Sequence, residues 1–300
     1  MNILITGASG FIGTQLVKRL SHHQLTLLTR HPEHTAERLG EHHHYLSSLD
    51  GLTNLDSFDA VINLAGEPIA GKRWSDAQKK NICHSRWSIT AKLAQLSSAS
   101  DNPPSVFISA SAVGYYGSQG SQHIDEASQL SPESKAEFTH QVCQKWEQEA
   151  QNAASETTRV CIIRIGLVLG AQGGALAKML PAFKLGLGGP IASGQQGMSW
   201  VHLDDLIALI EFLLINPHTS GVYNGCTPTP VSNKEFTKAL ASALNRPACI
   251  PAPAFGLKLA LGEMSTLLID GQYVVPKRTL QEGFTFKYST IDSALNALFK

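Results

Sequence analysis

Apolar runs of strand length alternate with stretches of helical periodicity over the first 170 residues. The runs are rich in Ile, Leu and Val, and nearly continuous apolar strands are typical of a parallel sheet buried on both faces. The predicted strands are 2–6, 25–30, 59–66, 105–111 and a strand within 158–170 that runs into a loop, and the predicted helices between them are 11–20, 75–98 and 137–153. This alternation predicts an α/β fold with a doubly wound parallel sheet of the Rossmann type.

The pattern changes after residue 170. A glycine-rich stretch, 186–200, is followed by further helical patterns with proline-rich interruptions. We therefore expect a first domain over 1–170 that holds the sheet, and a smaller, mostly helical substrate lobe over 171–300. Segments near 199–230 are expected to return to the first domain, because such lobes often donate a strand back to the sheet.

Composition and charge exclude several classes of function. Lys plus Arg equals Asp plus Glu at 24 each, so no net charge favours nucleic acid or an anionic membrane as a partner. No apolar stretch approaches the roughly eighteen residues of a transmembrane helix, and no signal peptide is evident. The five cysteines form no CxxC pair, and no metal-ligand spacing is evident. We expect a cytoplasmic location, reduced cysteines and no metal site.

Three glycines follow the first predicted strand in the stretch TGASGFIG. Between a strand and a helix, Gly7 permits a tight turn, Gly10 lets the backbone approach a pyrophosphate, and Gly13 lets the helix pack closely on the strand. The helix N-terminus attracts the phosphate charge. The stretch predicts a dinucleotide site, and the alternative is a purely structural turn.

The second predicted strand ends with Thr29 and Arg30 and carries no acidic residue there. In folds of this kind an acid at that position binds the ribose 2′-hydroxyl of NAD, whereas an arginine accommodates the 2′-phosphate of NADP. The sequence therefore favours NADP as the cofactor. The alternative is that Arg30 is an ordinary solvated side chain.

Longer stretches of the chain resemble the extended short-chain dehydrogenase/reductase superfamily, which includes nucleoside-diphosphate-sugar epimerases. The stretches that carry this resemblance are TGASGFIG (6–13), VINLAGE (61–67), FISASAVGYYG (107–117) and SWVHLDDL (199–206). The chain is most similar to the atypical NAD(P)-binding subgroup called the epimerase family. Further marks of that subgroup are KWE (145–147), RIGLVLG (164–170), GLGGPI (186–191) and the C-terminal segment 262–286. Members of the subgroup lack a well-defined substrate.

The resemblance implies a role for individual residues around a bound dinucleotide. Those expected to line its phosphates are Gly7, Ser9, Gly10, Phe11 and Ile12, with Thr29 and Arg30 at the 2′-phosphate. Those expected along the adenine-ribose side are Leu64, Ala65 and Gly66. Those expected near the nicotinamide are Ser109, Ser111 and Gly166, and Ser111 matches the catalytic serine of the superfamily.

The catalytic Tyr-x-x-x-Lys pair of the superfamily is missing. Thr139 and Cys143 stand where the tyrosine and the lysine are expected. That tyrosine exchanges the substrate proton, and the lysine lowers its pKa and holds the nicotinamide ribose. We expect Tyr115, together with Ser111, to carry the proton chemistry instead, because both lie at the carboxyl edge of the sheet. Alternatively, Tyr115 and its neighbour Tyr116 only shape the pocket.

Two further positions carry open expectations. Arg86, in the predicted helix 75–98, is expected to reach the pyrophosphate or a substrate anion, and the alternative is a surface ion pair. In SWVHLDDL, Asp204 and Asp205 are expected to cap the following helix rather than His202 facing the pocket.

Taken together, the residues predict an NADP-dependent oxidoreductase or epimerase-like enzyme acting on a small polar substrate. A homodimer is allowed, and nucleic acid and membranes are not expected as partners. The alternative is an NADP(H)-binding sensor or regulatory protein without turnover, and the missing Tyr-x-x-x-Lys pair is the feature that favours it.

Overall fold

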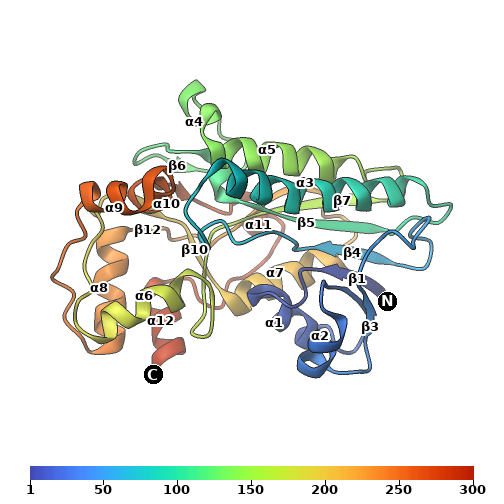
Figure 1. The fold of residues 1–300 in the computed structure, drawn as a ribbon, viewed down its shortest axis with the longest axis horizontal. Helices are drawn as coiled ribbons and strands as arrows, with labels where there is room; N and C mark the ends of the chain where they lie inside the picture. The colour runs from blue at the N-terminus through green and yellow to red at the C-terminus, as the bar shows by residue number, and fades with distance from the viewer.

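A seven-stranded, entirely parallel sheet forms the first lobe of the computed structural model, which describes residues 1–300 (Figure 1). In spatial order the strands are β11 (Gly221–Gly225), β7 (Arg159–Ile165), β5 (Val106–Ala112), β4 (Ala60–Asn63), β1 (Asn2–Thr6), β2 (Gln24–Leu28) and β3 (His44–Leu46). The chain moves outward from β1 to β3, then returns to β4 on the other side of β1. The predicted doubly wound Rossmann-type sheet is confirmed.

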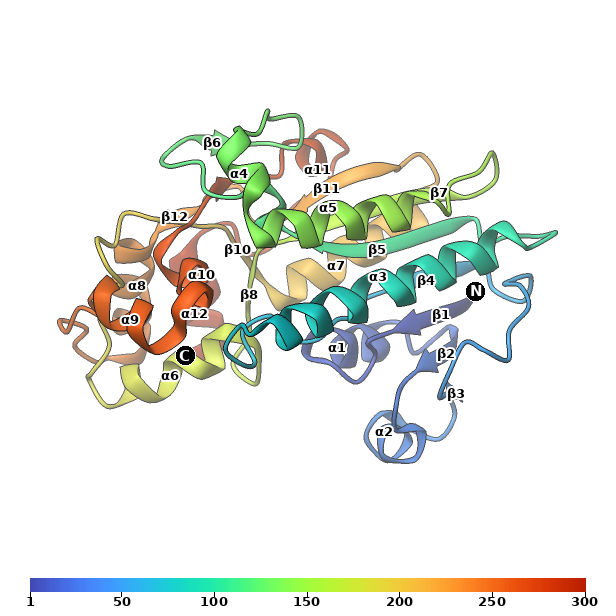
Figure 2. The same ribbon diagram turned by 45° about the horizontal axis from the view of Figure 1, so that its top comes forward.

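Helices cover both faces of this sheet (Figures 1 and 2). On one face lie α3 (Asp76–Ser98) and α5 (Phe138–Gln151), and on the other lie α1 (Phe11–Arg19) and α7 (Leu203–Ile215), with α2 (Pro32–Leu39) beside α1. Alternate residues of β1 point to opposite faces. Ile3 and Ile5 pack in the core cluster that contains α1 and α7, whereas Leu4 packs in the cluster that contains α3 and α5. This two-sided burial explains why the strands are almost continuously apolar.

The predicted strand 158–170 is interrupted in the structure. It ends as β7 at Ile165, and β8 (Leu167–Leu169) then leaves the sheet to pair with β10 (Trp200–His202). Gly166 lies at the break, where an added Cβ would be 2.4 Å from the carbonyl oxygen of Ser199. The sequence predicted a strand that runs into a loop, and in the structure the strand ends at Ile165, because the approach of a backbone from elsewhere in the chain redirects it.

The N-terminal cap of α7 is His202 and not the two aspartates. Its Nδ1 atom accepts a hydrogen bond from the backbone N–H of Asp204 at 3.1 Å. The carboxylate of Asp205 is turned toward the C-terminal segment, where it accepts from the backbone N–H groups of Lys287 and Tyr288 at 2.8 and 2.9 Å. The expectation that the aspartates cap the helix was wrong because a tertiary contact takes Asp205.

The second lobe is built mainly from helices that pack around Trp200, Phe236 and Leu295. Its helices are α6 (Gly174–Lys184), α8 (Asn233–Leu244), α9 (Ala254–Leu261), α10 (Thr266–Ile269) and α12 (Ile291–Phe299), and α9 leads into the 3-10 turn η2 (Gly262–Ser265). Two short strand pairs lie outside the main sheet: β6 (His123–Ile124) pairs with β13 (Tyr273–Val274), and β9 (Gly197–Met198) pairs with β12 (Val231–Ser232). The remaining short elements are η1 (Val113–Tyr116), α4 (Pro132–Ala136) and α11 (Lys277–Gln281). None of the helices combines the length and apolarity needed to cross a membrane.

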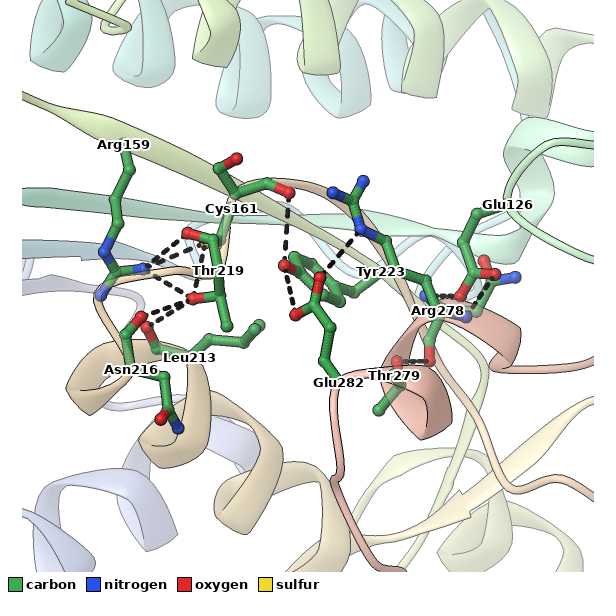
Figure 3. Close-up of polar contacts among 12 residues, drawn as sticks. Glu126, Arg159, Cys161, Leu213, Asn216, Thr219, Tyr223, Arg278, Thr279 and Glu282 are labelled. Carbon is green, nitrogen blue, oxygen red and sulfur yellow. Dashed lines mark hydrogen bonds and ion pairs between the residues drawn. The ribbon is translucent and has the colours of Figure 1, made fainter. Parts of the chain in front are cut away.

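A polar network fastens the C-terminal segment to the outer strand of the sheet (Figure 3). Glu126 accepts from the backbone N–H groups of Asn224 and Arg278 at 3.0 and 3.1 Å. The hydroxyl of Tyr223 and the guanidinium of Arg278 both donate to Glu282, at 2.8 and 3.2 Å. Burial, followed by the bond to Glu282, raises the pKa of Tyr223. The segment around α11 is therefore fastened to β11, the edge strand next to β7.

Candidate functional site

A crevice opens at the carboxyl ends of β1 and β4, where the strand order reverses. Ligands of open α/β sheets bind at such points. The crevice holds a cavity of about 620 Å³, which we call the first cavity, between the β1–α1 turn, the end of β2, the residues after β4 and one face of α3. The predicted site residues that line it are Gly7, Ser9, Gly10, Thr29, Arg30, Leu64, Ala65 and Gly66.

The geometry of the β1–α1 turn requires its glycines. Gly7 has a φ of +71°, and an added Cβ would lie 2.6 Å from the carbonyl oxygen of Leu64. At Gly13 a Cβ would lie 2.2 Å from the carbonyl oxygen of Gly7. Gly10 is the N-cap of α1 and offers no side chain to the first turn. The backbone N–H groups at this helix end are therefore left for an anion in the crevice.

Arg30 is exposed at the rim of the first cavity and forms no hydrogen bond or ion pair within the chain. The turn that presents it is held by Thr29, whose hydroxyl lies 2.9 Å from that of Thr35 and accepts from the backbone N–H of His31 at 3.3 Å. A fixed backbone with a free guanidinium suits the recognition of a phosphate.

Several residues that the sequence did not single out also line the first cavity. They are Ser47, Ser48 and Asp50 after β3, and His84, Ser85, Ser88, Ile89 and Lys92 on α3. The spacing of 84, 88 and 92 places three polar side chains on one helix face, and this signal was available in the sequence. Strand β3 is only three residues long, which is too short for a periodicity to reveal it.

Three of the predicted cofactor residues have side chains directed elsewhere. Phe11 packs against the β8–α6 loop, where a Cβ added to Gly173 would lie 2.4 Å from its ring. Ile12 packs against the core cluster of α1 and α7, so both residues offer only their backbone to a ligand. Ser109 is fully buried, and its hydroxyl accepts from Asn63 at 3.3 Å.

Ser111 belongs to a buried ion-pair network beneath the carboxyl end of β5. Its hydroxyl donates to Glu147 at 2.6 Å. Arg164 donates to both carboxylate oxygens of Glu147, from Nε at 2.9 Å and from Nη2 at 2.8 Å. Burial alone disfavours the charged guanidinium, but the bonds to Glu147 and its charge outweigh burial and raise the pKa of Arg164. Because the Ser111 proton is directed to Glu147, only the lone pairs of its oxygen remain for a ligand.

The two tyrosines of GYYG have different surroundings. The guanidinium carbon of Arg164 lies 3.4 Å from the ring centroid of Tyr115 and 4.8 Å from that of Tyr116. Tyr116 is fully buried and donates to the amide oxygen of Asn224 at 2.8 Å, and burial raises its pKa to about 12. Tyr115 is half-buried, and its hydroxyl has no hydrogen-bond partner within the chain. Of the two, only Tyr115 has a free hydroxyl.

Arg86 is a half-buried cation without a carboxylate partner. Its guanidinium lies 2.9 Å from the position of a Cβ added to Gly66 and 5.1 Å from the centroid of the Trp146 ring. Its hydrogen bond within the chain goes from Nη1 to the carbonyl oxygen of Ile82, at 3.0 Å. Burial lowers the pKa of this guanidinium, and the charge of Glu67 is among the influences that act in the opposite direction. The structure rules out the surface ion pair as an account of Arg86.

The fold and the crevice define a protein of the Rossmann class, with a glycine turn facing the switch point of the sheet. Comparisons with known proteins narrow this class. A model of the NAD dependent epimerase/dehydratase family matches residues 3–225, and a model of a domain of unknown function, DUF1731, matches residues 252–298. The chain belongs to the NAD dependent epimerase/dehydratase family, as the resemblance to the extended short-chain dehydrogenases/reductases predicted.

The relatives match over almost the whole chain. The chloroplastic homologue of epimerase family protein SDR39U1 from Arabidopsis thaliana is 42% identical, over 100% of this chain and 87% of its own length. The crystal structure of human SDR39U1 (isoform 2) with NADPH is 34% identical, has a TM-score of 0.91 and matches over 99% of both chains. A nucleoside-diphosphate sugar epimerase from Corynebacterium glutamicum is 28% identical with a TM-score of 0.77, over 100% of this chain and 58% of that one.

Proposed function

We propose that the crevice binds NADP(H) and that the protein is an oxidoreductase or epimerase-like enzyme acting on a small polar substrate. The observation that carries the cofactor assignment is Arg30, a free guanidinium at the end of β2, where the sequence has no acidic residue. The human relative crystallised with NADPH supports the same cofactor. The nicotinamide supplies or accepts a hydride when it is bound, and the remaining chemistry belongs to the side chains of the chain.

Each part of the crevice has a distinct role in this proposal. The backbone around Gly10 and Phe11 holds the pyrophosphate, since the N–H groups at the start of α1 are uncapped. Ser9, Thr29 and Arg30 hold the 2′-phosphate. The residues that follow β4 would hold the adenosine, with the carboxylate of Asp50 as a hydrogen-bond acceptor in the same cavity. Residues at the ends of β5 and β7 would hold the nicotinamide.

Replacing Arg30 by alanine is expected to weaken NADP(H) binding about ten- to a hundredfold, because a charge-assisted bond contributes on the order of 1.5–3 kcal/mol. NAD(H), which lacks the phosphate, is expected to bind the variant as it binds the unchanged protein. Titration of the fluorescence of NADPH and NADH measures both. Lys18→Ala is the control, because Lys18 is exposed on α1 and lines neither the first cavity nor the cavity next to it at Ser9 and Gly10. Equal weakening of both cofactors would overturn the assignment.

We further propose that Arg86 supplies the cation that α5 lacks at position 143. Cys143 is buried next to Ser111, and burial raises its pKa to about 11, so it carries no charge. The guanidinium of Arg86 comes from α3 to lie near this thiol. It lies beside Gly66 and Trp146 and does not line the first cavity, so in this proposal it would contact the nicotinamide half of the dinucleotide rather than the adenosine.

Arg86→Gln is therefore expected to lower the affinity for NADPH about ten- to a hundredfold. The affinity for adenosine 2′,5′-bisphosphate is expected to stay unchanged, since that fragment lacks the nicotinamide half. Arg30→Ala is expected to lower the affinity for both ligands by a similar factor. Calorimetric titration of the two ligands separates these patterns, and Arg86→Lys is expected to restore part of the NADPH affinity. An equal loss for both ligands in Arg86→Gln would contradict the placement.

The second candidate is an NADP(H)-binding sensor without turnover. The observations that favour it are Thr139 and Cys143 in place of the catalytic pair, and the commitment of the Ser111 proton to Glu147. A panel of carbonyl and sugar-nucleotide substrates distinguishes the two, with NADPH absorbance measuring net reduction and chromatography of the sugar nucleotides measuring epimerisation, which consumes no cofactor. Turnover of any member supports the enzyme, whereas NADPH binding with no turnover across the panel supports the sensor.

A further inference from the structure

Helix α9 has an unusual surface for a helix of a water-exposed lobe. Six of its eight residues, AFGLKLAL, are apolar, and none of its residues is buried. Phe255 and Leu259 are 78% and 71% exposed, and their spacing of four places them on the same helix face. By contrast, α12 buries Ile291, Ala294 and Leu295 against its neighbours. The apolar face of α9 is not covered by any part of the chain.

Neighbouring segments extend this face. Leu185, Leu187 and Ile250 are 73%, 56% and 53% exposed. The backbone N–H of Ile250 donates to the carbonyl of Gly188 at 3.2 Å, so the end of α6 and the segment before α9 lie side by side. We call Leu185, Leu187, Ile250, Phe255 and Leu259 the apolar patch. It holds five of the nine large apolar residues that are exposed on the molecule, so these residues gather on one lobe rather than scatter.

The charged residues on the segments of the apolar patch are all cations. The segments that carry it, 180–192 and 244–261, contain Lys184, Arg246 and Lys258 and no acidic residue. Among the nearest acids in the sequence, Glu263 is paired with Lys79 at 2.5 Å, and Asp270 lies near Lys258. A second copy of the chain would place these cations against one another. An anionic surface instead complements them, and lysine stems can lie along an apolar layer while their ammonium groups reach phosphates.

We propose that the apolar patch binds the surface of an anionic lipid bilayer, with Phe255 and Leu259 in the interfacial layer and the three cations at the headgroups. Balanced charge over the whole chain predicted no membrane partner, but the fold gathers cations and exposed apolar side chains at one end. In Figures 1 and 2, α9 lies in the lobe opposite β2 and β3, so the first cavity stays clear of the bilayer.

Co-sedimentation of the full chain with vesicles tests this proposal. Binding to vesicles of phosphatidylglycerol and phosphatidylcholine is expected, with little binding to phosphatidylcholine alone. The double variant Phe255→Ser, Leu259→Ser is expected to lose at least tenfold in affinity, because two large apolar side chains no longer enter the lipid. The double variant Lys184→Glu, Lys258→Glu is expected to bind the anionic vesicles at least tenfold more weakly, because each cation near the surface contributes a factor of roughly five to the affinity. The control is Ile215→Ser, which removes an apolar side chain that is 62% exposed at the end of α7.

Thermal unfolding and NADPH titration of each variant show whether the fold is retained. The proposal is supported if both double variants lose binding to the anionic vesicles while Ile215→Ser binds them as the unchanged protein does. Absence of binding to the anionic vesicles overturns it, as does equal binding by the serine double variant. A concentration-dependent dimer that the serine double variant abolishes, with no vesicle binding, would assign the apolar patch to a second copy instead.

Discussion

Arg164→Met is expected to lower the free energy of unfolding by about 3–5 kcal/mol, because it leaves the buried carboxylate of Glu147 without its cation. Arg164 and Glu147 are 5% and 9% exposed, so water cannot replace the missing charge. The loss also removes the guanidinium that lies against Tyr115 and Tyr116. Urea denaturation followed by circular dichroism measures the change, and the dependence of the unfolding free energy on urea concentration is expected to stay constant.

The matched control is the double variant Arg164→Met, Glu147→Leu. Replacing both members of a buried ion pair by apolar residues of similar size is often close to neutral, since no charge remains to be desolvated. The double variant is therefore expected to be more stable than the single one. A single variant within about 1 kcal/mol of the unchanged protein would show that the pair contributes little.

Tyr115→Phe is expected to lower turnover by about 10²–10⁴ while leaving folding and NADPH affinity intact, because a positioned acid–base group contributes that factor in rate. The structure supports this choice of ring, since the Tyr115 hydroxyl is the free one at the end of β5. It also changes the role of Ser111. With its proton directed to Glu147, Ser111 can accept a hydrogen bond from a substrate hydroxyl, but it does not donate to a carbonyl while that bond is made. Initial rates with a substrate found in the panel measure the effect.

Tyr116→Phe is the internal control. It removes a buried hydrogen bond to Asn224, so it is expected to lower stability by about 1–3 kcal/mol and to leave the rate unchanged. Loss of turnover in Tyr116→Phe with full turnover in Tyr115→Phe would move the proton chemistry to the other ring. Full turnover in both would remove the tyrosines from the chemistry and favour a proton from another source.

The structural role of the glycines in the stretch 186–200 could not be predicted from the sequence. Glycines in series suggest a loop without fixed packing. In the structure an added Cβ at Gly189 would lie 1.9 Å from the carbonyl oxygen of Ile250, and one at Gly271 would lie 2.2 Å from that of Gly197. These glycines allow backbones from distant parts of the chain to touch, and that role depends on which segment arrives there.

The sequence by itself determined the doubly wound sheet and part of the crevice at its switch point, namely the glycine turn, the end of β2 and the residues after β4. The strands are apolar because both faces are covered, and Gly7, Gly10 and Gly13 act within one local turn, so the information lies in neighbouring residues. Only the tertiary structure decided which groups meet across the sheet. Ser111, Glu147 and Arg164 come from β5, α5 and β7, and Arg86 reaches Trp146 from another helix. These partners decide which groups are charged, which way each hydrogen bond points and which cation stays unpaired. The sequence does not show these properties, because burial and pairing act through space and leave no periodic signal along the chain.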